Sequence, residues 1–260
     1  MPHYARLPLP AAAAAILACP TAWAQRVQPL GEPLEIEDAI LTEQGELELQ
    51  GAAIYERLRN DSRGRNQWPT QLQIQAGIAR RLEGRISVED AFGNSEEARE
   101  GGAVRLGLFY RFTELRPGPV PALSMLVEAG LPYGPGGRST QTTVIGAASW
   151  ETPGSNPLSF HLNLGWLARP DPSPEERPHR YRVAVALTQA LSPDTALLAA
   201  YRRDQQERGE RDLNLVLAGI RTRITPDTTL GLVGGVGIGQ DSPELHIGLG
   251  IERQFSLGAW

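Results

Sequence analysis

Ser159, His161 and Asn163 are the residues whose types could do nucleophilic chemistry, because they alternate along one short stretch of the chain. A serine becomes a nucleophile when a histidine within hydrogen-bond reach takes its proton. In an extended strand, however, residues two apart lie about 6.5–7 Å apart at their Cα atoms, which is wide for a direct bond. We therefore interpret the three residues as a polar stripe on a strand, and we keep a lipid hydrolase that uses Ser159 and His161 as a weaker alternative.

Other chemistries find little support in the sequence. The histidines His3, His161, His179 and His246 have no metal-ligand spacing. Cys19 is the single cysteine, which argues against disulfides, zinc–thiolate sites and a cysteine nucleophile. The 25 basic residues are all arginine and are outnumbered by 30 acidic ones, without a basic stripe that would suit nucleic acid. We expect no metal, no cofactor, no nucleic-acid partner and no enzymatic activity.

The elements that position these side chains are strands, because apolar and polar residues alternate with period two from residue 45 onward. Most of these stretches reach ten residues or more, whereas a tilted strand needs about 9–11 residues to cross a bilayer. In the tenth stretch, the apolar face is expected to be Leu213, Leu215 and Leu217. Twelve strands are predicted, near residues 45–59, 68–81, 84–91, 102–113, 120–131, 139–150, 156–168, 179–190, 195–204, 211–223, 228–238 and 243–254.

The connections between these strands alternate between long polar loops and tight turns rich in Pro, Gly, Asp and Ser. An even number of strands with long loops at one end and short turns at the other is typical of outer-membrane barrels. The predicted fold class is therefore all-β, an antiparallel transmembrane β-barrel of about 12 strands. A soluble β-sandwich or soluble barrel is the alternative, because aromatic residues make up only 6% of the chain. Candidates for an aromatic girdle are Tyr110, Phe112, Trp150 and Trp166.

The N-terminal residues predict export. Arg6, an apolar run over residues 11–18 and the small residues of Ala22-Trp23-Ala24 make residues 1–24 a predicted cleaved signal peptide. A lipoprotein signal ending at Cys19 is the alternative. We expect residues 25–44 to be a periplasmic N-terminal segment and residues 45–260 to form the barrel in a bacterial outer membrane. The last strand is expected to end on an aromatic residue, either Phe255 or Trp260.

Short motifs over roughly residues 35–135 resemble a known family. They are Glu37-Asp38-Ala39, Gly45-Glu46-Leu47-Glu48-Leu49, Tyr55-Glu56-Arg57, Thr70-Gln71-Leu72-Gln73, Gly107-Leu108-Phe109-Tyr110-Arg111-Phe112, Pro121-Ala122-Leu123 and Gly130-Leu131-Pro132. In this order they are similar to the outer-membrane proteins named for the meta-cleavage pathway of phenol degradation. The resemblance implies a transporter-like β-barrel for small, often hydrophobic molecules, and it implies no catalytic residue.

If the apolar side chains face lipid, the residues between them face the lumen. There they either set the selectivity of a pore or pair into a structural network. The function predicted is a passive channel or uptake protein for small solutes, and a structural or adhesive barrel without a pore is the alternative. Expected partners are outer-membrane lipids, the barrel assembly machinery and a small-molecule solute. The lumen-facing candidates are Glu46, Glu48, Glu56, Arg85, Glu89, Arg105, Arg111, Glu128, His161, Arg180, Arg182, His246 and Glu252.

Overall fold

The computed structural model is an all-β barrel with an antiparallel ring of strands, described at residues 34, 36–59, 65–95, 101–134 and 139–257. Each of the twelve predicted strands is present, and the predicted signal peptide lies outside the described residues. Within the described part of the chain no helix is long and apolar enough to cross a membrane. The strands are β1 Glu46–Arg57, β2 Asn66–Ala79, β3 Leu82–Gly93, β4 Ala103–Arg111, β5 Ala122–Pro132, β6 Gln141–Glu151, β7 Leu158–Ala168, β8 His179–Ser192, β9 Thr195–Asp204, β10 Leu213–Thr225, β11 Thr228–Gly237 and β12 Leu245–Ser256.

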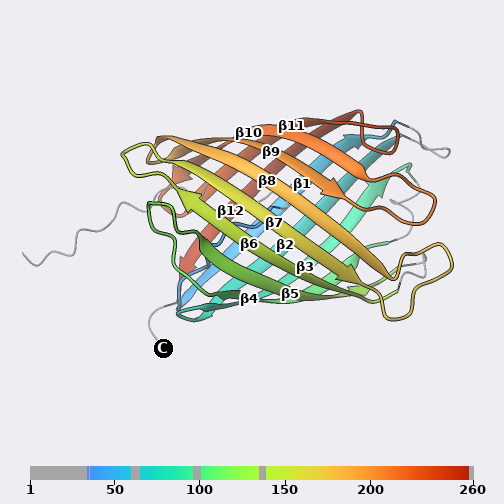
Figure 1. Ribbon diagram of the computed structural model, residues 1–260, viewed down its shortest axis with the longest axis horizontal. Coiled ribbons are helices and arrows are strands. Elements are labelled where there is room, and N and C mark those ends of the chain that lie inside the picture. The colour runs from blue at the N-terminus through green and yellow to red at the C-terminus, as the bar shows by residue number, and fades with distance from the viewer. Residues whose placement is uncertain (1–33, 35, 60–64, 96–100, 135–138, 258–260) are drawn as a thin grey trace, which may run out of the picture.

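The ring closes because the first strand pairs with the last, from Glu46 opposite Ser256 to Arg57 opposite Leu245. Closure leaves no strand edge with unpaired backbone groups, a condition that lipid imposes on any sheet that spans a membrane. The described chain enters β1 and leaves β12 at the same end, where Leu257 N donates to Gly45 O over 2.9 Å. We call this end the short-turn end and the opposite one the long-loop end (Figure 1).

The outer surface of the barrel is apolar. Alternate residues of the strands point outward and remain exposed, and Leu108, Leu164 and Leu249 are 54%, 57% and 58% exposed. A continuous apolar surface of this kind is rare on soluble monomers and marks contact with a membrane or a partner. The burial pattern therefore places the apolar face outside, as the membrane-barrel interpretation predicts.

Outward-facing aromatic side chains gather near both ends of this apolar band. At the long-loop end Tyr55 packs on Trp68 and Trp166 stacks on His179, with ring centroids 4.9 and 5.3 Å apart. Aromatic rings at these two levels are the arrangement that membrane–water interfaces favour. Phe255, at the end of β12, also faces outward, whereas Trp260 lies outside the described residues. The pairs at the short-turn end are Tyr110–Phe112 and Trp150–Phe160, with centroids 5.1 and 5.4 Å apart.

The face predicted for the tenth strand is wrong. Leu215 and Leu217 point into the barrel and are almost fully buried, while Val216 and Ile220 are exposed on the outside. Apolar residues occur on both faces of β10, so alternation alone does not determine which face is inside. The inward leucines show that part of the lumen wall is apolar.

Candidate functional site: the barrel lumen

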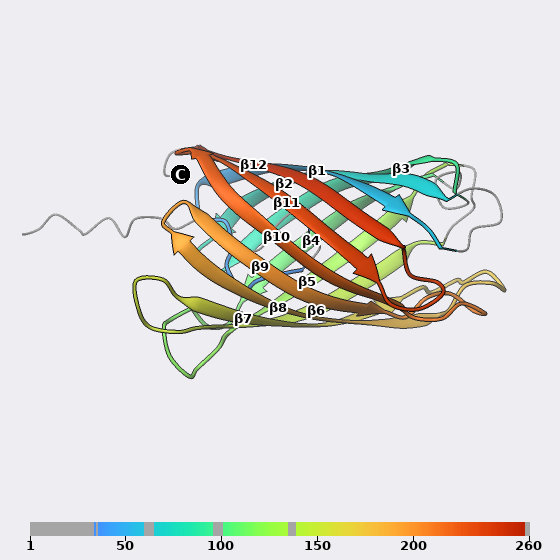
Figure 2. The ribbon, with the colours of Figure 1, turned by 90° about the horizontal axis from the view of Figure 1, so that it is seen from above.

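A stretch of chain that precedes β1 lies inside the barrel (Figure 2). We call residues 36–44, together with Leu34, the lumen segment. It enters at the short-turn end, where Gln44 forms a bridge with Gly77 of β2. A Cβ atom on Gly77 would lie 2.0 Å from Glu43 O, so only glycine permits this crossing. Residues 25–44 were expected to be periplasmic. The structure instead puts their described part in the lumen, and residues 25–33 and 35 lie outside the described residues.

Three side chains of the wall bind the backbone of the lumen segment. Asn163 of β7 accepts from Glu37 N and donates to Glu37 O, each over 2.7 Å. Ser149 Oγ of β6 accepts from Ala39 N over 3.0 Å, and Glu83 of β3 accepts from Thr42 N over 2.7 Å. A backbone that runs through a lumen without strand partners must satisfy its polar groups in this way.

The apolar side chains of the lumen segment have seats on opposite walls. Leu34 and Ile36 are 1% and 3% exposed and pack on β8–β11, whereas Leu41 packs on β4–β6. Burying each of them contributes about 1.5–3 kcal/mol to holding the segment in place. The seat on β8–β11 comprises Ala184, Ala186, Leu198, Ala200, Leu215, Leu217 and Val233, and the seat on β4–β6 comprises Phe109, Leu126 and Ile145.

Charged groups fix the polar side of the lumen segment. Arg85 of β3 forms an ion pair with Glu37 over 2.8 Å and a second one with Glu83. Its guanidinium lies 4.4 Å from the centroid of the Phe109 ring, a distance typical of a cation–π contact. Because the arginine is buried, it needs both carboxylates and the ring as partners. Arg85 therefore joins the lumen segment to the wall.

His161 does not bond to Ser159. Its register partner across β6 and β7 is Ser149, and Ser149 Oγ lies 2.9 Å from His161 Nδ1. The other ring nitrogen, Nε2, lies 3.3 Å from Thr188 Oγ1, so hydroxyl groups rather than a carboxylate flank the ring. His161 is fully buried, and Ser149 is covered by the lumen segment. Ser149 joins the wall to the lumen segment through Ala39 N, and His161 contacts Ser149 within the wall.

The thirteen lumen-facing candidates all lie on the inward face of their strands, and they occur toward both ends of the barrel. Near the short-turn end, Glu48 accepts from Gln50 and Gln254, Glu252 pairs with the buried Arg221, and Arg111 donates to Arg80 O. Glu46 lies half-buried where β1 begins. Toward the long-loop end, the pairs are Glu89–Arg105 at 2.7 Å, Arg182–Asp204 at 3.0 Å and Glu56–His246 at 2.9 Å, while Glu128 packs against Gly107.

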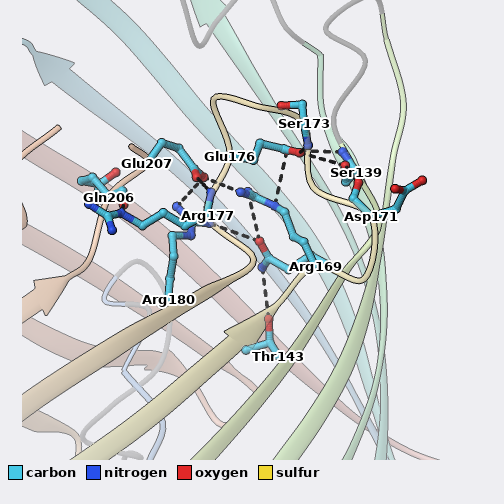
Figure 3. Close-up of polar contacts among 11 residues, drawn as sticks. Ser139, Thr143, Arg169, Asp171, Ser173, Glu176, Arg177, Arg180, Gln206 and Glu207 are labelled. Atoms are coloured by element: carbon cyan, nitrogen blue, oxygen red, sulfur yellow. Dashed lines mark hydrogen bonds and ion pairs between the residues drawn. The ribbon is translucent and has the colours of Figure 1, made fainter. Parts of the chain in front are cut away.

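At the long-loop end, Arg180 belongs to a cluster that joins three loops (Figure 3). Arg169 and Arg180 share Glu207 from the loop after β9, and Arg169 also pairs with Glu176. Glu176 accepts from Ser139 Oγ and Ser173 N, each over 2.8 Å. Burial raises the pKa of the Glu176 carboxyl, but these hydrogen bonds and the Arg169 guanidinium outweigh it and hold that pKa below its ordinary value. The loops are thus bound together by charge beside the lumen.

Several residues that bind the lumen segment were not predicted from the sequence. Glu83 and Ser149 alternate with the apolar residues of their strands, which predicts that they face the lumen. Many other polar residues share this position, so the pattern does not single these two out. Phe109 lies between Leu108 and Tyr110, and an apolar residue on both faces of a strand indicates an inward partner. That partner is Leu41 of the lumen segment.

Solved structures share this architecture. An outer membrane channel from Pseudomonas putida F1 has a TM-score of 0.63 at 12% identity, over 87% of this chain and 100% of that one. The NanC porin has a TM-score of 0.53 at 12% identity, over 80% and 98%. Omp33 of Acinetobacter baumannii has a TM-score of 0.51 at 11% identity, over 82% and 100%. At these identities the likeness shows the fold, that of outer-membrane barrels.

No family model and no curated protein matches the chain. The resemblance of residues 35–135 to the family named for phenol degradation therefore stays a prediction. The barrel fold that it implied is present. In the part of the chain that the structure describes, no group of three or more His, Cys, Asp or Glu side chains could hold a metal ion.

Proposed function

We propose that this chain is an outer-membrane channel for small solutes, exported through a cleaved signal peptide formed by residues 1–24. The observation that carries the proposal is the distribution of side chains on a closed ring. Apolar residues face outward between two aromatic levels, and charged pairs such as Glu89–Arg105 face inward. A surface of this kind needs lipid outside, and a polar lining suits hydrated solutes inside. The solved porins and channels with the same fold support this proposal.

The outer surface of the barrel indicates which partners its insertion into the membrane would require. The lipids of the outer membrane would cover the apolar band, and the barrel assembly machinery would recognise the last strand through Phe255. The proposed solute is a small molecule of either charge, because the lumen carries side chains of both signs. The proposal includes a hydrophobic solute, which the family resemblance implies.

The test begins with the outer-membrane fraction, analysed on a denaturing gel with and without boiling. A folded barrel resists the detergent and shifts in mobility on heating. The purified protein is then reconstituted into planar lipid bilayers, where a channel gives discrete conductance steps. A protein recovered from the soluble periplasmic fraction, or a folded barrel that conducts neither with nor without the lumen segment, contradicts the proposal.

A structural or adhesive barrel is the second candidate, and one observation favours it. The lumen segment fills part of the interior, and the loop cluster of Arg169, Glu176 and Glu207 binds the loops together. Such a barrel would act through its outer loops and would show no conductance whether or not the lumen segment is present.

A further inference from the structure

The lumen segment occupies the barrel without forming part of its wall. The pairing of β1 with β2 begins at Leu47, and the pairing of β1 with β12 begins at Glu46. The bridge from Gln44 to Gly77 is an isolated one. The ring is therefore complete without residues 34–43, and the lumen segment can leave the lumen without breaking a strand ladder.

The lumen segment also lies across the ring. Its Thr42 end contacts β2 and β3, its middle contacts β6 and β7, and its Leu34 end packs on β8–β11. A chain with this path crosses the lumen from one wall to the opposite one. Its attachments to the wall are side-chain contacts rather than strand pairing: Asn163, Ser149 and Glu83 bind its backbone, and Arg85 forms an ion pair with Glu37.

We propose that the lumen segment is a displaceable plug: while it is seated the channel is closed, and its exit toward the short-turn end opens it. The proposal rests on the proposed function, because a plug has meaning only in a channel. The direction follows from the attachment at Gly45, whose backbone bonds Gly77 O over 3.2 Å at the short-turn end. The wall of the barrel is closed, so exit is along the barrel axis.

The first experiment locks the plug. Ala39 N lies 3.0 Å from Ser149 Oγ, so the pair Ala39→Cys and Ser149→Cys places two cysteines on adjacent backbones, where an oxidant is used to join them. Cys19, the single native cysteine, lies in the predicted signal peptide. In planar bilayers the oxidised protein should stay closed, and a reductant should restore openings. Ala39→Cys alone, treated in the same way, should not respond to reductant. Equal conductance before and after reduction, with the disulfide confirmed by mass, overturns the proposal.

The second experiment removes the plug. A variant that lacks residues 30–42 keeps the predicted signal peptide and β1, and it should conduct continuously. A synthetic peptide with the sequence of residues 34–44 should block this variant, whereas a scrambled peptide should not. If the full chain and the variant conduct equally, the plug is wrong and the channel stands. If neither conducts although both show the heat-dependent mobility shift, the proposed function fails and the plug fails with it.

A pair of point variants decides the question if the shortened chain does not fold. Asn163→Ala removes both bonds to Glu37, and two such bonds correspond to a change of roughly 5- to 150-fold in the open–closed ratio. Ser124→Ala is the matched control, because Ser124 is also inward and buried but its hydroxyl has no partner among the described residues. The open fraction should rise for Asn163→Ala alone. Equal open fractions for the two variants overturn the proposal.

Discussion

Gly77 offers a sharp test of how the lumen segment is held. Its Gly77→Ala variant would place a Cβ atom 2.0 Å from Glu43 O and 2.7 Å from Thr42 O, whereas ordinary contact begins at 3.4 Å. The backbone of the lumen segment must therefore move by more than 1 Å. Overpacking of this size costs about 1–3 kcal/mol, which corresponds to a change of roughly 5- to 150-fold in an equilibrium constant. We expect that penalty to fall on the seated state of the lumen segment.

The assay is thiol labelling in an Ala39→Cys background. Ala39 is fully buried, so a thiol at this position reacts with a water-soluble maleimide only when the lumen segment is out of its seat. Gly77→Ala should speed the labelling by roughly 5- to 150-fold. The control is Gly234→Ala, since a Cβ atom at Gly234 of β11 meets nothing within 4 Å. Equal labelling rates for the two variants would refute the reasoning, because the clash would then have been absorbed by the strands.

The remaining predictions address the membrane, the ion pairs, the loops and the hydrolase alternative. Leu164→Arg, midway along the outer face of β7, should lower the free energy of unfolding in lipid vesicles by about 2–4 kcal/mol. His179→Arg, near the long-loop end, should lower it by only about 0–1 kcal/mol. Equal losses for the two variants would contradict lipid contact. In a urea titration of the protein in lipid vesicles, Arg85→Met should lower the free energy of unfolding by about 3–5 kcal/mol, because Glu83 is left buried without its cation. Adding Glu83→Gln should recover part of that loss, and strictly additive losses would count against a coupled pair. The loop at residues 169–178 should resist pepsin fully above pH 4.5, because the hydrogen bonds of the Glu176 carboxylate are then intact, and it should lose this resistance only as the pH falls through the lowered pKa of Glu176. Glu176→Gln should show no such transition. A wild-type transition at pH 4.5 or above would contradict this prediction. Ser149→Ala and Ser159→Ala should leave ester hydrolysis by the purified protein at its background rate, and a loss in either variant would revive the hydrolase alternative.

Much of the fold could be predicted from the sequence because strand alternation is a local property. The twelve predicted stretches coincide with the twelve strands, although their ends differ by a few residues. Membrane barrels make this pattern long and regular, since every strand must present an apolar face to lipid. The face of β10 could not be assigned, because Leu215 and Val216 are both apolar and only the tertiary structure separates them.

The lumen segment could not be predicted from the same pattern. Its apolar residues Leu34, Ile36 and Leu41 follow no strand register, because their partners lie on seven different strands far away in the chain. The polar partners are equally nonlocal, since Glu37 and Asn163 are separated by 126 positions. A polar residue in the inward phase shows only that it faces the lumen; which other residue it meets there depends on how the ring closes.

The attachment of the lumen segment to β1 has a consequence for how fully its seat is occupied. A segment that is tethered next to its own seat experiences an effective concentration in the millimolar range. A seat with an intrinsic affinity too weak to capture a free peptide can therefore remain occupied most of the time. By the same reasoning, a free peptide or solute competes with the tethered segment only at millimolar concentration, or when it binds the seat far more tightly.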